Sequence, residues 1–288
     1  MKKIGLVLLL LVSSVYAKLV ATTTIYPLYS IVKEVGGDRV QLNNLIPFGT
    51  DPHEFEPTPK DMITLSKSNL FITSSSVMEP WAKKIVQANN LQDITVDMSK
   101  FVTIKKHKSF KEGKTFDPHY WLSFDNYIKM IKEIKSLLIK KDPKNSAVYA
   151  KNAKNYLEKV KALQSKYETL KSCKNKKVIV NHDAFGYLAD DYGIKQYSIS
   201  GMSPDEQPSA KQIAQLIKIA KKEHIHTVFF EKFASDKVAK TIAREAGATS
   251  EELSPVGNIS KEDNRKNIGY LDIIEDNLKK LKGAMDCQ

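Results

Sequence analysis

Short apolar runs alternate with helix-like stretches in both halves of this 288-residue chain. Strands that alternate with helices form parallel sheets, and about 270 residues exceed what one core usually serves. The pattern therefore predicts an α/β fold with two βα lobes. In the first lobe we expect strands at 19–24, 40–46, 70–73 and 94–96 with helices at 29–35, 59–68 and 80–89, and in the second strands at 177–181, 194–199 and 227–231 with helices at 209–224 and 236–247.

A long segment without regular breaks separates the two halves. After Asp142 and Pro143, apolar residues recur every three or four positions, and neither glycine nor proline occurs before Cys173. This spacing predicts one helix of about 25 residues, or roughly 38 Å. We expect domains at 18–141 and 174–288, joined by a linking helix at 142–173. The segment is either an ordinary helix of one lobe or a backbone strut that limits how far the lobes can hinge.

The N-terminus has the order of a secretory signal peptide. Two lysines precede an apolar run, and small residues follow it up to Ala17, so residues 1–17 are predicted to be removed on export. A membrane anchor is the alternative, but the run is too short to span a bilayer. Because no cysteine follows the cleavage site, we expect a periplasmic protein without a lipid anchor. In an oxidising compartment, Cys173 and Cys287 are then expected to form one disulfide.

The formal net charge of +12 raises the question of a nucleic-acid partner. The lysines are spread along helical stretches and alternate with apolar and acidic residues, which is typical of solvated helix faces. We therefore expect no nucleic-acid binding.

Two histidines occur in the same tripeptide, Asp-Pro-His, at His53 and at His119, and a third, His182, follows a predicted strand. Aspartate as a helix N-cap with proline at the first helical position would place each of the first two rings at the start of a helical turn. A neutral ring is favoured there, and a neutral ring is what a metal ion binds. Asp-Pro is also simply a common helix opening, so one copy alone would mean little.

The predicted strands place these histidines together. His182 and Glu231 each end a strand of the second sheet, at the carboxyl edge where ligands bind in open α/β folds. His53 follows the strand at 40–46, and His119 precedes a helix expected near residue 124. All four can face a cleft between the lobes. The remaining histidines are expected at the surface: His224 and His226 at the far end of their strand, and His107 in a lysine-rich loop.

Six segments resemble the zinc and manganese solute-binding proteins of bacterial ABC transporters, in the family's order and with comparable spacing. The resemblance implies two βα lobes bridged by a long helix, one divalent metal ion in the cleft, and delivery to a membrane permease. It also matches His53, His119 and His182 to three family ligands. The segments are Thr22–Pro27, Gly36–Asp38, Gly49–Pro57, Asp117–Leu122, His182–Tyr187 and Phe229–Glu231. We expect a monomer.

The predicted ligand set favours zinc over manganese. Manganese-type members carry an acidic residue at the third position and an aspartate in a late loop, whereas this chain has His182 and the loop 253–257 without an acid. Three imidazoles suit Zn²⁺, and oxygen-rich sites suit Mn²⁺. A water would complete a tetrahedron, with Glu231 as a possible fourth ligand or as a hydrogen-bond acceptor outside the ligand set. The loop at 101–116 is short and lysine-rich, unlike the His-rich loop of many zinc-type members.

Three alternatives remain at this point. A three-histidine zinc site with an open position is also the arrangement of a hydrolase, in which Glu231 would be the general base. A manganese-selective binding protein is the second alternative. An adhesive surface protein is the third, although the missing lipid anchor is evidence against it.

Overall fold

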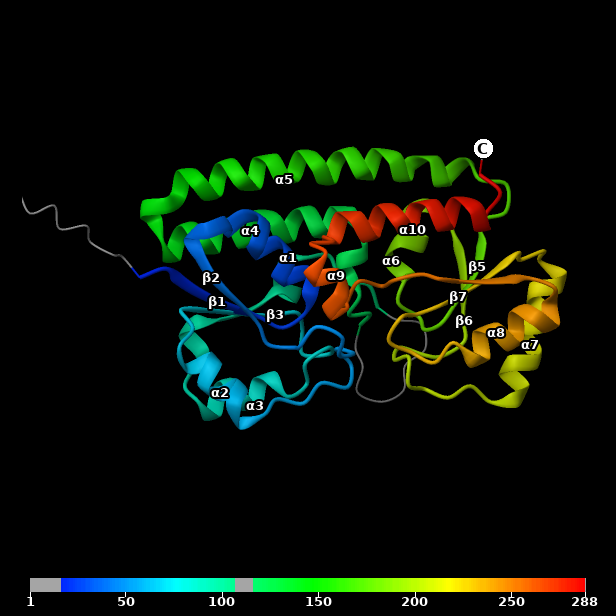
Figure 1. The fold of residues 1–288 in the computed structure, drawn as a ribbon, viewed down its shortest axis with the longest axis horizontal. Helices are drawn as coiled ribbons and strands as arrows, with labels where there is room; N and C mark the ends of the chain where they lie inside the picture. Colours follow the sequence, from blue (N-terminus) through cyan, green and yellow to red (C-terminus); the bar gives the residue numbers. More distant parts are fainter. Residues whose placement is uncertain (1–16, 107–115, 288) are drawn as a thin grey trace, which may run out of the picture.

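The computed structural model describes residues 17–106 and 116–287. The predicted signal peptide, His107 and most of the loop at 101–116 lie outside these residues. Two four-stranded parallel sheets form the protein, with the strand orders β2-β1-β3-β4 and β6-β5-β7-β8 (Figure 1). The predicted α/β fold with two parallel sheets is therefore confirmed. The strands are β1 (Leu19–Thr23), β2 (Val40–Asn44), β3 (Leu70–Thr73), β4 (Thr95–Asp97), β5 (Lys177–Val180), β6 (Lys195–Ser198), β7 (Thr227–Phe230) and β8 (Thr249–Glu252).

The first sheet is covered on both faces, and every residue of its central strand β3 is buried. In β3, Phe71 packs into a cluster with Leu45 and Leu65, whereas the next residue, Ile72, belongs to the large core on the opposite face. Successive side chains of a strand point to opposite faces, so this alternation buries both. Helices α2 (Pro59–Ser66) and α3 (Ala82–Ala88) lie on one side of the sheet, and α1 (Tyr26–Gly36) lies on the other (Figure 1).

The second sheet is built in the same way, with one strand that the sequence did not reveal. Ile179 and Val228 pack against α7 (Ala210–Lys222) and α8 (Lys237–Ala246). Helix α8 ends at Gly247, as predicted, with a left-handed φ of 73° that glycine adopts without strain. The added strand, β8, is the edge strand beside β7 and has the polar sequence Thr-Ser-Glu-Glu. Three helices were also not predicted: α6 (Gly186–Tyr192), α9 (Lys261–Arg265) and α10 (Tyr270–Ala284).

The predicted linking helix forms as α5 (Ser146–Tyr167), with 3₁₀ turns before and after it. It is 22 residues long. It packs against α4 (Phe124–Lys141) and α1, and α10 runs beside its C-terminal half (Figure 1). Among the described residues, none of the helices combines the length and the apolar character that crossing a membrane requires.

Aromatic residues join α5 to the helices of both lobes. Tyr127 of α4 stacks on Tyr270 of α10 with ring centroids 4.1 Å apart, and its hydroxyl lies 2.9 Å from that of Tyr156 on α5. The hydroxyl of Tyr167 donates to the carbonyl of Ile274 at 2.7 Å. One continuous apolar core extends from Leu19 to Met285 through these contacts. The core favours the strut interpretation of α5; the domain boundaries at 141/142 and 173/174 stay predictions.

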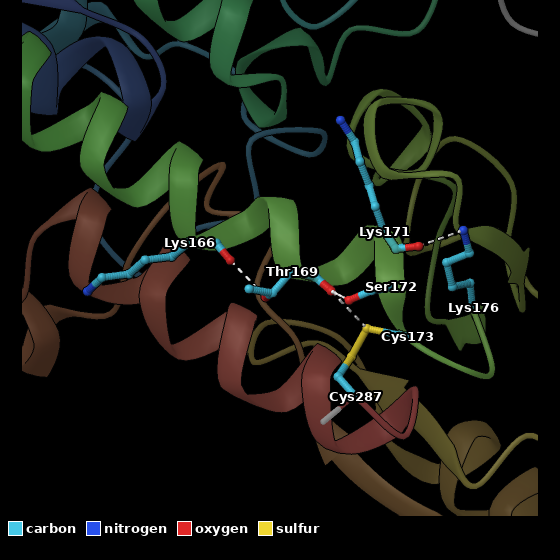
Figure 2. The surroundings of a disulfide bond; sticks show 7 residues. All are labelled: Lys166, Thr169, Lys171, Ser172, Cys173, Lys176 and Cys287. Carbon is cyan, nitrogen blue, oxygen red and sulfur yellow. Dashed lines mark hydrogen bonds between the residues drawn. A yellow bond between two sulfur atoms is a disulfide. The ribbon is translucent and has the colours of Figure 1, made fainter.

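Cys173 and Cys287 form the expected disulfide (Figure 2). Cys173 follows the 3₁₀ turn at the end of α5, and Cys287 follows α10, so the bond joins the two neighbouring helices at one end. The backbone supports it, because the amide of Asn175 donates to the carbonyl of Met285 at 3.1 Å. The bond closes a loop with a sequence separation of 114.

We predict that replacing both cysteines with serine lowers the free energy of unfolding by about 2–5 kcal/mol, because the unfolded chain regains the freedom of a long loop. Urea unfolding of the oxidised wild type, the reduced wild type and the double variant measures this. The reduced wild type is the matched control and should behave like the variant. Equal unfolding midpoints for all three, or two free thiols by mass spectrometry in freshly isolated protein, would contradict the prediction.

Candidate metal centre

Three of the predicted site residues meet at one point. The Nε2 atom of His119 lies 3.2 Å from that of His53 and 3.1 Å from that of His182. A tetrahedral Zn²⁺ with Zn–N bonds of about 2.0–2.1 Å would separate two nitrogen ligands by roughly 3.3 Å. Both distances from His119 are thus close to the spacing that a metal ion requires, and the ligand atoms of all three rings lie within 4.8 Å of one another. Within the described ranges, these rings form the one group of three or more histidine, cysteine or acidic residues close enough to hold an ion.

The two Asp-Pro-His segments are turns, and the predicted helix openings are wrong. The backbone amide of His53 donates to Oδ1 of Asp51 at 2.8 Å, and the amide of His119 donates to Oδ1 of Asp117 at 2.9 Å. Each aspartate therefore caps the amide two residues on, in an Asx turn. After His53, no helix begins until Pro59. After His119, only a 3₁₀ turn, Tyr120–Leu122, follows directly. Neither histidine begins an α-helix. A helix dipole therefore does not explain a neutral ring at either position.

Carboxylates supply the orientation instead. Asp117 Oδ1 lies 2.9 Å from His119 Nδ1, and Glu231 Oε1 lies 2.5 Å from His182 Nδ1. All four side chains are buried. A ring that donates its Nδ1 proton to a carboxylate presents the lone pair of Nε2, and such pairs fix ring direction in metal sites. Of the two roles expected for Glu231, the geometry matches the acceptor outside the ligand set.

Glu231 also sets the pKa of the ring that it contacts. Burial by itself lowers the pKa of His182, but the charge and hydrogen bond of Glu231 raise it, and the net pKa lies above the usual value. Asp51 and Asp117 act in the same direction. Burial raises the pKa of Asp51 itself to about 6. A positive charge is therefore favoured at this point of the molecule.

A cavity of about 370 Å³ opens beside the three rings and is lined by residues of both lobes. His53 and Met78 come from the first lobe and Glu231 from the second, and the loop that follows β8 forms a wall. As predicted, that loop carries no acid from Leu253 to Gly257. Trp121, which the sequence analysis did not single out, lies with its ring centroid 5.3 Å from that of His119 and donates from Nε1 to the carbonyl of Pro255 at 2.8 Å.

The other two histidines of the described residues lie outside this group. His224 and His226 are exposed, as expected, and His226 Nε2 lies 3.6 Å from Asp286 Oδ2 near the C-terminus. The sequence analysis gave Asp117 only the role of a helix cap and missed its contact with the ring of His119. Its position two residues before His119 could have indicated that contact. At that spacing, one carboxylate oxygen reaches both the amide and the ring of the same histidine.

Comparison with known proteins agrees with the fold. Residues 21–284 match the family described as zinc-uptake complex component A, periplasmic. The chain belongs to this family. The high-affinity zinc uptake system protein ZnuA of Bacillus subtilis (strain 168) is 38% identical over 280 residues, which cover 93% of this chain and 88% of ZnuA.

Two further comparisons concern Streptococcus pneumoniae. The zinc-binding lipoprotein AdcA of serotype 4 (strain ATCC BAA-334 / TIGR4) is 37% identical over 288 residues, covering 93% of this chain but 56% of AdcA. The chain thus spans little more than half of that relative. The crystal structure of the Zn(II)-bound ZnuA-like domain of AdcA has a TM-score of 0.81 and 36% identity, covering 94% of this chain and all of that one (100%). AdcA is named a lipoprotein, which differs from the unanchored state expected for this chain.

We predict that Glu231→Gln weakens Zn²⁺ binding by about 10–100-fold, because the ring of His182 loses the charged acceptor that orients it. Glu252→Gln is the matched control: Glu252 lines the same cavity, and its loss removes the same charge. Calorimetric titration of both variants with Zn²⁺ measures the difference. If the two variants weaken binding equally, the cavity's overall charge, rather than the hydrogen bond to His182, sets the affinity.

We also predict that Zn²⁺ affinity falls as the pH falls through the raised pKa of His182, by about tenfold per pH unit once that ring is protonated. Because its pKa is raised, a protonated His182 stabilises the metal-free protein at pH values below the usual histidine pKa of about 6.5. This stabilisation is lost as the pH rises through the raised pKa, so Zn²⁺ competes with the proton less at high pH. The shift of the melting temperature by Zn²⁺ should therefore grow from pH 5.5 to pH 8. A shift independent of pH would show that no imidazole proton is released on binding.

Proposed function

We propose that this protein is the exported zinc-binding component of an ABC transporter, which captures one Zn²⁺ ion through His53, His119 and His182 and delivers it to a membrane permease. The observation that carries the proposal is that the Nε2 atoms of His53 and His182 lie 3.2 and 3.1 Å from that of His119. The Nδ1 atoms of His119 and His182 face buried carboxylates. Family membership supports it, since the relatives are named for zinc uptake and zinc binding. Zinc is the cargo here, and we expect a monomer in the periplasm.

The donor set is the reason for preferring zinc to manganese. Imidazole nitrogens suit Zn²⁺, whereas Mn²⁺ prefers carboxylate, carbonyl and water oxygens. Asp117 Oδ1 and Glu231 Oε1 accept from the Nδ1 atoms of His119 and His182, on the side of each ring away from Nε2. We propose that a water molecule takes the fourth position and that Zn²⁺ keeps a tetrahedral site.

The same hydrogen bonds argue against the hydrolase alternative. A hydrolase would need Glu231 as a general base on the metal-bound water. Glu231 Oε1 instead accepts from the ring of His182 at 2.5 Å and from its amide at 3.3 Å. Capture and release of the ion therefore fit the geometry better than chemistry on a bound water.

The test is a titration of wild type and of the three single alanine variants with Zn²⁺ and, in parallel, with Mn²⁺. We expect one Zn²⁺ per wild-type chain, tighter binding of Zn²⁺ than of Mn²⁺, and a loss of at least about 10-fold in each variant, because each loses one of three ligands. His226→Ala, which removes an exposed ring, is the control and should bind like the wild type. Wild-type affinity in all three variants would refute the ligand set, and tighter Mn²⁺ binding by the wild type would refute the metal.

A further inference from the structure

The loop that carries His53 is held mainly from the opposite side of the cleft. His53 is only half-buried, whereas His119 and His182 are 1% and 2% exposed. Its loop runs between β2 and α2 without regular structure, and its own backbone bonds are those of tight turns, such as the amide of Thr50 to the carbonyl of Pro47 at 3.1 Å. Of the three rings, that of His53 is therefore the most exposed.

The segment 255–259, which we call the clasp, forms hydrogen bonds to the loop that carries His53. It follows β8 of the second sheet. The side-chain amide of Asn258 donates to the carbonyls of Pro47 at 2.8 Å and Thr50 at 2.7 Å, and the amide of Gly49 donates to the carbonyl of Ile259 at 2.8 Å. Asn258 is 4% exposed, and its Oδ1 accepts from the amide of Ile259. Every hydrogen-bonding atom of this side chain is thus used by the clasp or by the His53 loop.

The backbone of the clasp is itself unusual. Val256 is fully buried and has a φ of 55°. The other positive φ values outside glycine belong, among the described residues, to asparagine, aspartate or histidine, which tolerate this region. A β-branched residue does not, so its conformation persists only where the surroundings fix it. The carbonyl of Gly257 accepts from the amide of Tyr26 at 3.0 Å, which is one such fixing contact to the first lobe.

We propose that Asn258 is a positioning residue for zinc binding. It ties the His53 loop to the clasp and so controls how long the imidazole of His53 stays bound to the ion. This inference rests on the proposed function. Loss of the Asn258 amide frees two carbonyls of the loop, and His53 then leaves the ion more often while His119 and His182 stay in place. The dissociation rate of Zn²⁺ is the quantity that changes most.

The test compares Asn258→Ala with Asn277→Ala. Asn277 is a matched control, because it is 2% exposed and makes two hydrogen bonds to Ser254, at 3.1 and 2.7 Å, just before the clasp and away from the His53 loop. In stopped-flow chelator competition we expect Asn258→Ala to release Zn²⁺ about tenfold faster than wild type, and Asn277→Ala within about twofold of it. Equal release rates for wild type and Asn258→Ala would overturn the inference. Failure of the wild type to bind Zn²⁺ would instead overturn the proposed function.

A double-mutant cycle separates positioning from a general loss of structure. In a His53→Ala background, Asn258→Ala should change Zn²⁺ affinity by less than about twofold, because its effect passes through the missing ring. The same fold-loss in both backgrounds would show a merely structural role and overturn the inference.

Wild-type hydrogen exchange provides a test that does not depend on a variant that folds. Zn²⁺ should slow exchange at the amides of Gly49 and Ile259, which bond to Ile259 and to the Asn258 side chain. Unchanged exchange at both amides on zinc binding would likewise overturn the inference.

Discussion

The continuous apolar core along α5 is the constraint on which the site depends. The ring nitrogens of His53 and His182 must each come within 3.2 Å of that of His119, although His53 follows a strand of the first sheet and His182 a strand of the second. The stack of Tyr127 on Tyr270 and the bond from Tyr167 to Ile274 join α4, α5 and α10 into one packed layer. Because dense interiors deform little, this layer fixes the distance between the two sheets and hence between the loops at their carboxyl edges.

Buried carboxylates then make this geometry suited to a divalent ion. Asp117 and Glu231 lie 4% and 7% exposed beside the three rings, and carboxylates are expensive to bury without a counter-charge. The charge and hydrogen bond of Glu231 raise the pKa of His182, so a positive charge beside this carboxylate is favoured. A divalent ion bound by three neutral rings would balance both carboxylates. The carboxylates thus orient the rings and also favour a doubly charged occupant.

Sequence patterns predicted the two sheets, α5 and the meeting of the three histidines, because apolar runs and strand ends place residues without knowledge of tertiary contacts. The predictions were wrong where one local sequence pattern fits two backbone conformations. Asp-Pro-His fits a helix cap and an Asx turn equally well, since both begin with an aspartate bonded to a nearby amide, and only the packing around His53 and His119 decides. The edge strand β8 has no apolar run to reveal it. The role of Asn258 is invisible in sequence, because its partners lie 208 and 211 residues away.

The core and the clasp together indicate which motion can admit the ion. Rotating the lobes apart as rigid bodies would expose the aromatic layer along α5, at a cost of about 2.5 kcal/mol for each 100 Å² of apolar surface. Releasing the His53 loop breaks a few hydrogen bonds, each worth roughly 0.5–1.5 kcal/mol net. The second motion leaves the aromatic layer packed, and it moves the ring that is least buried. If Asn258 positions His53 as proposed, the ion enters and leaves on this side of the cleft, while His119 and His182 keep their places against their carboxylates.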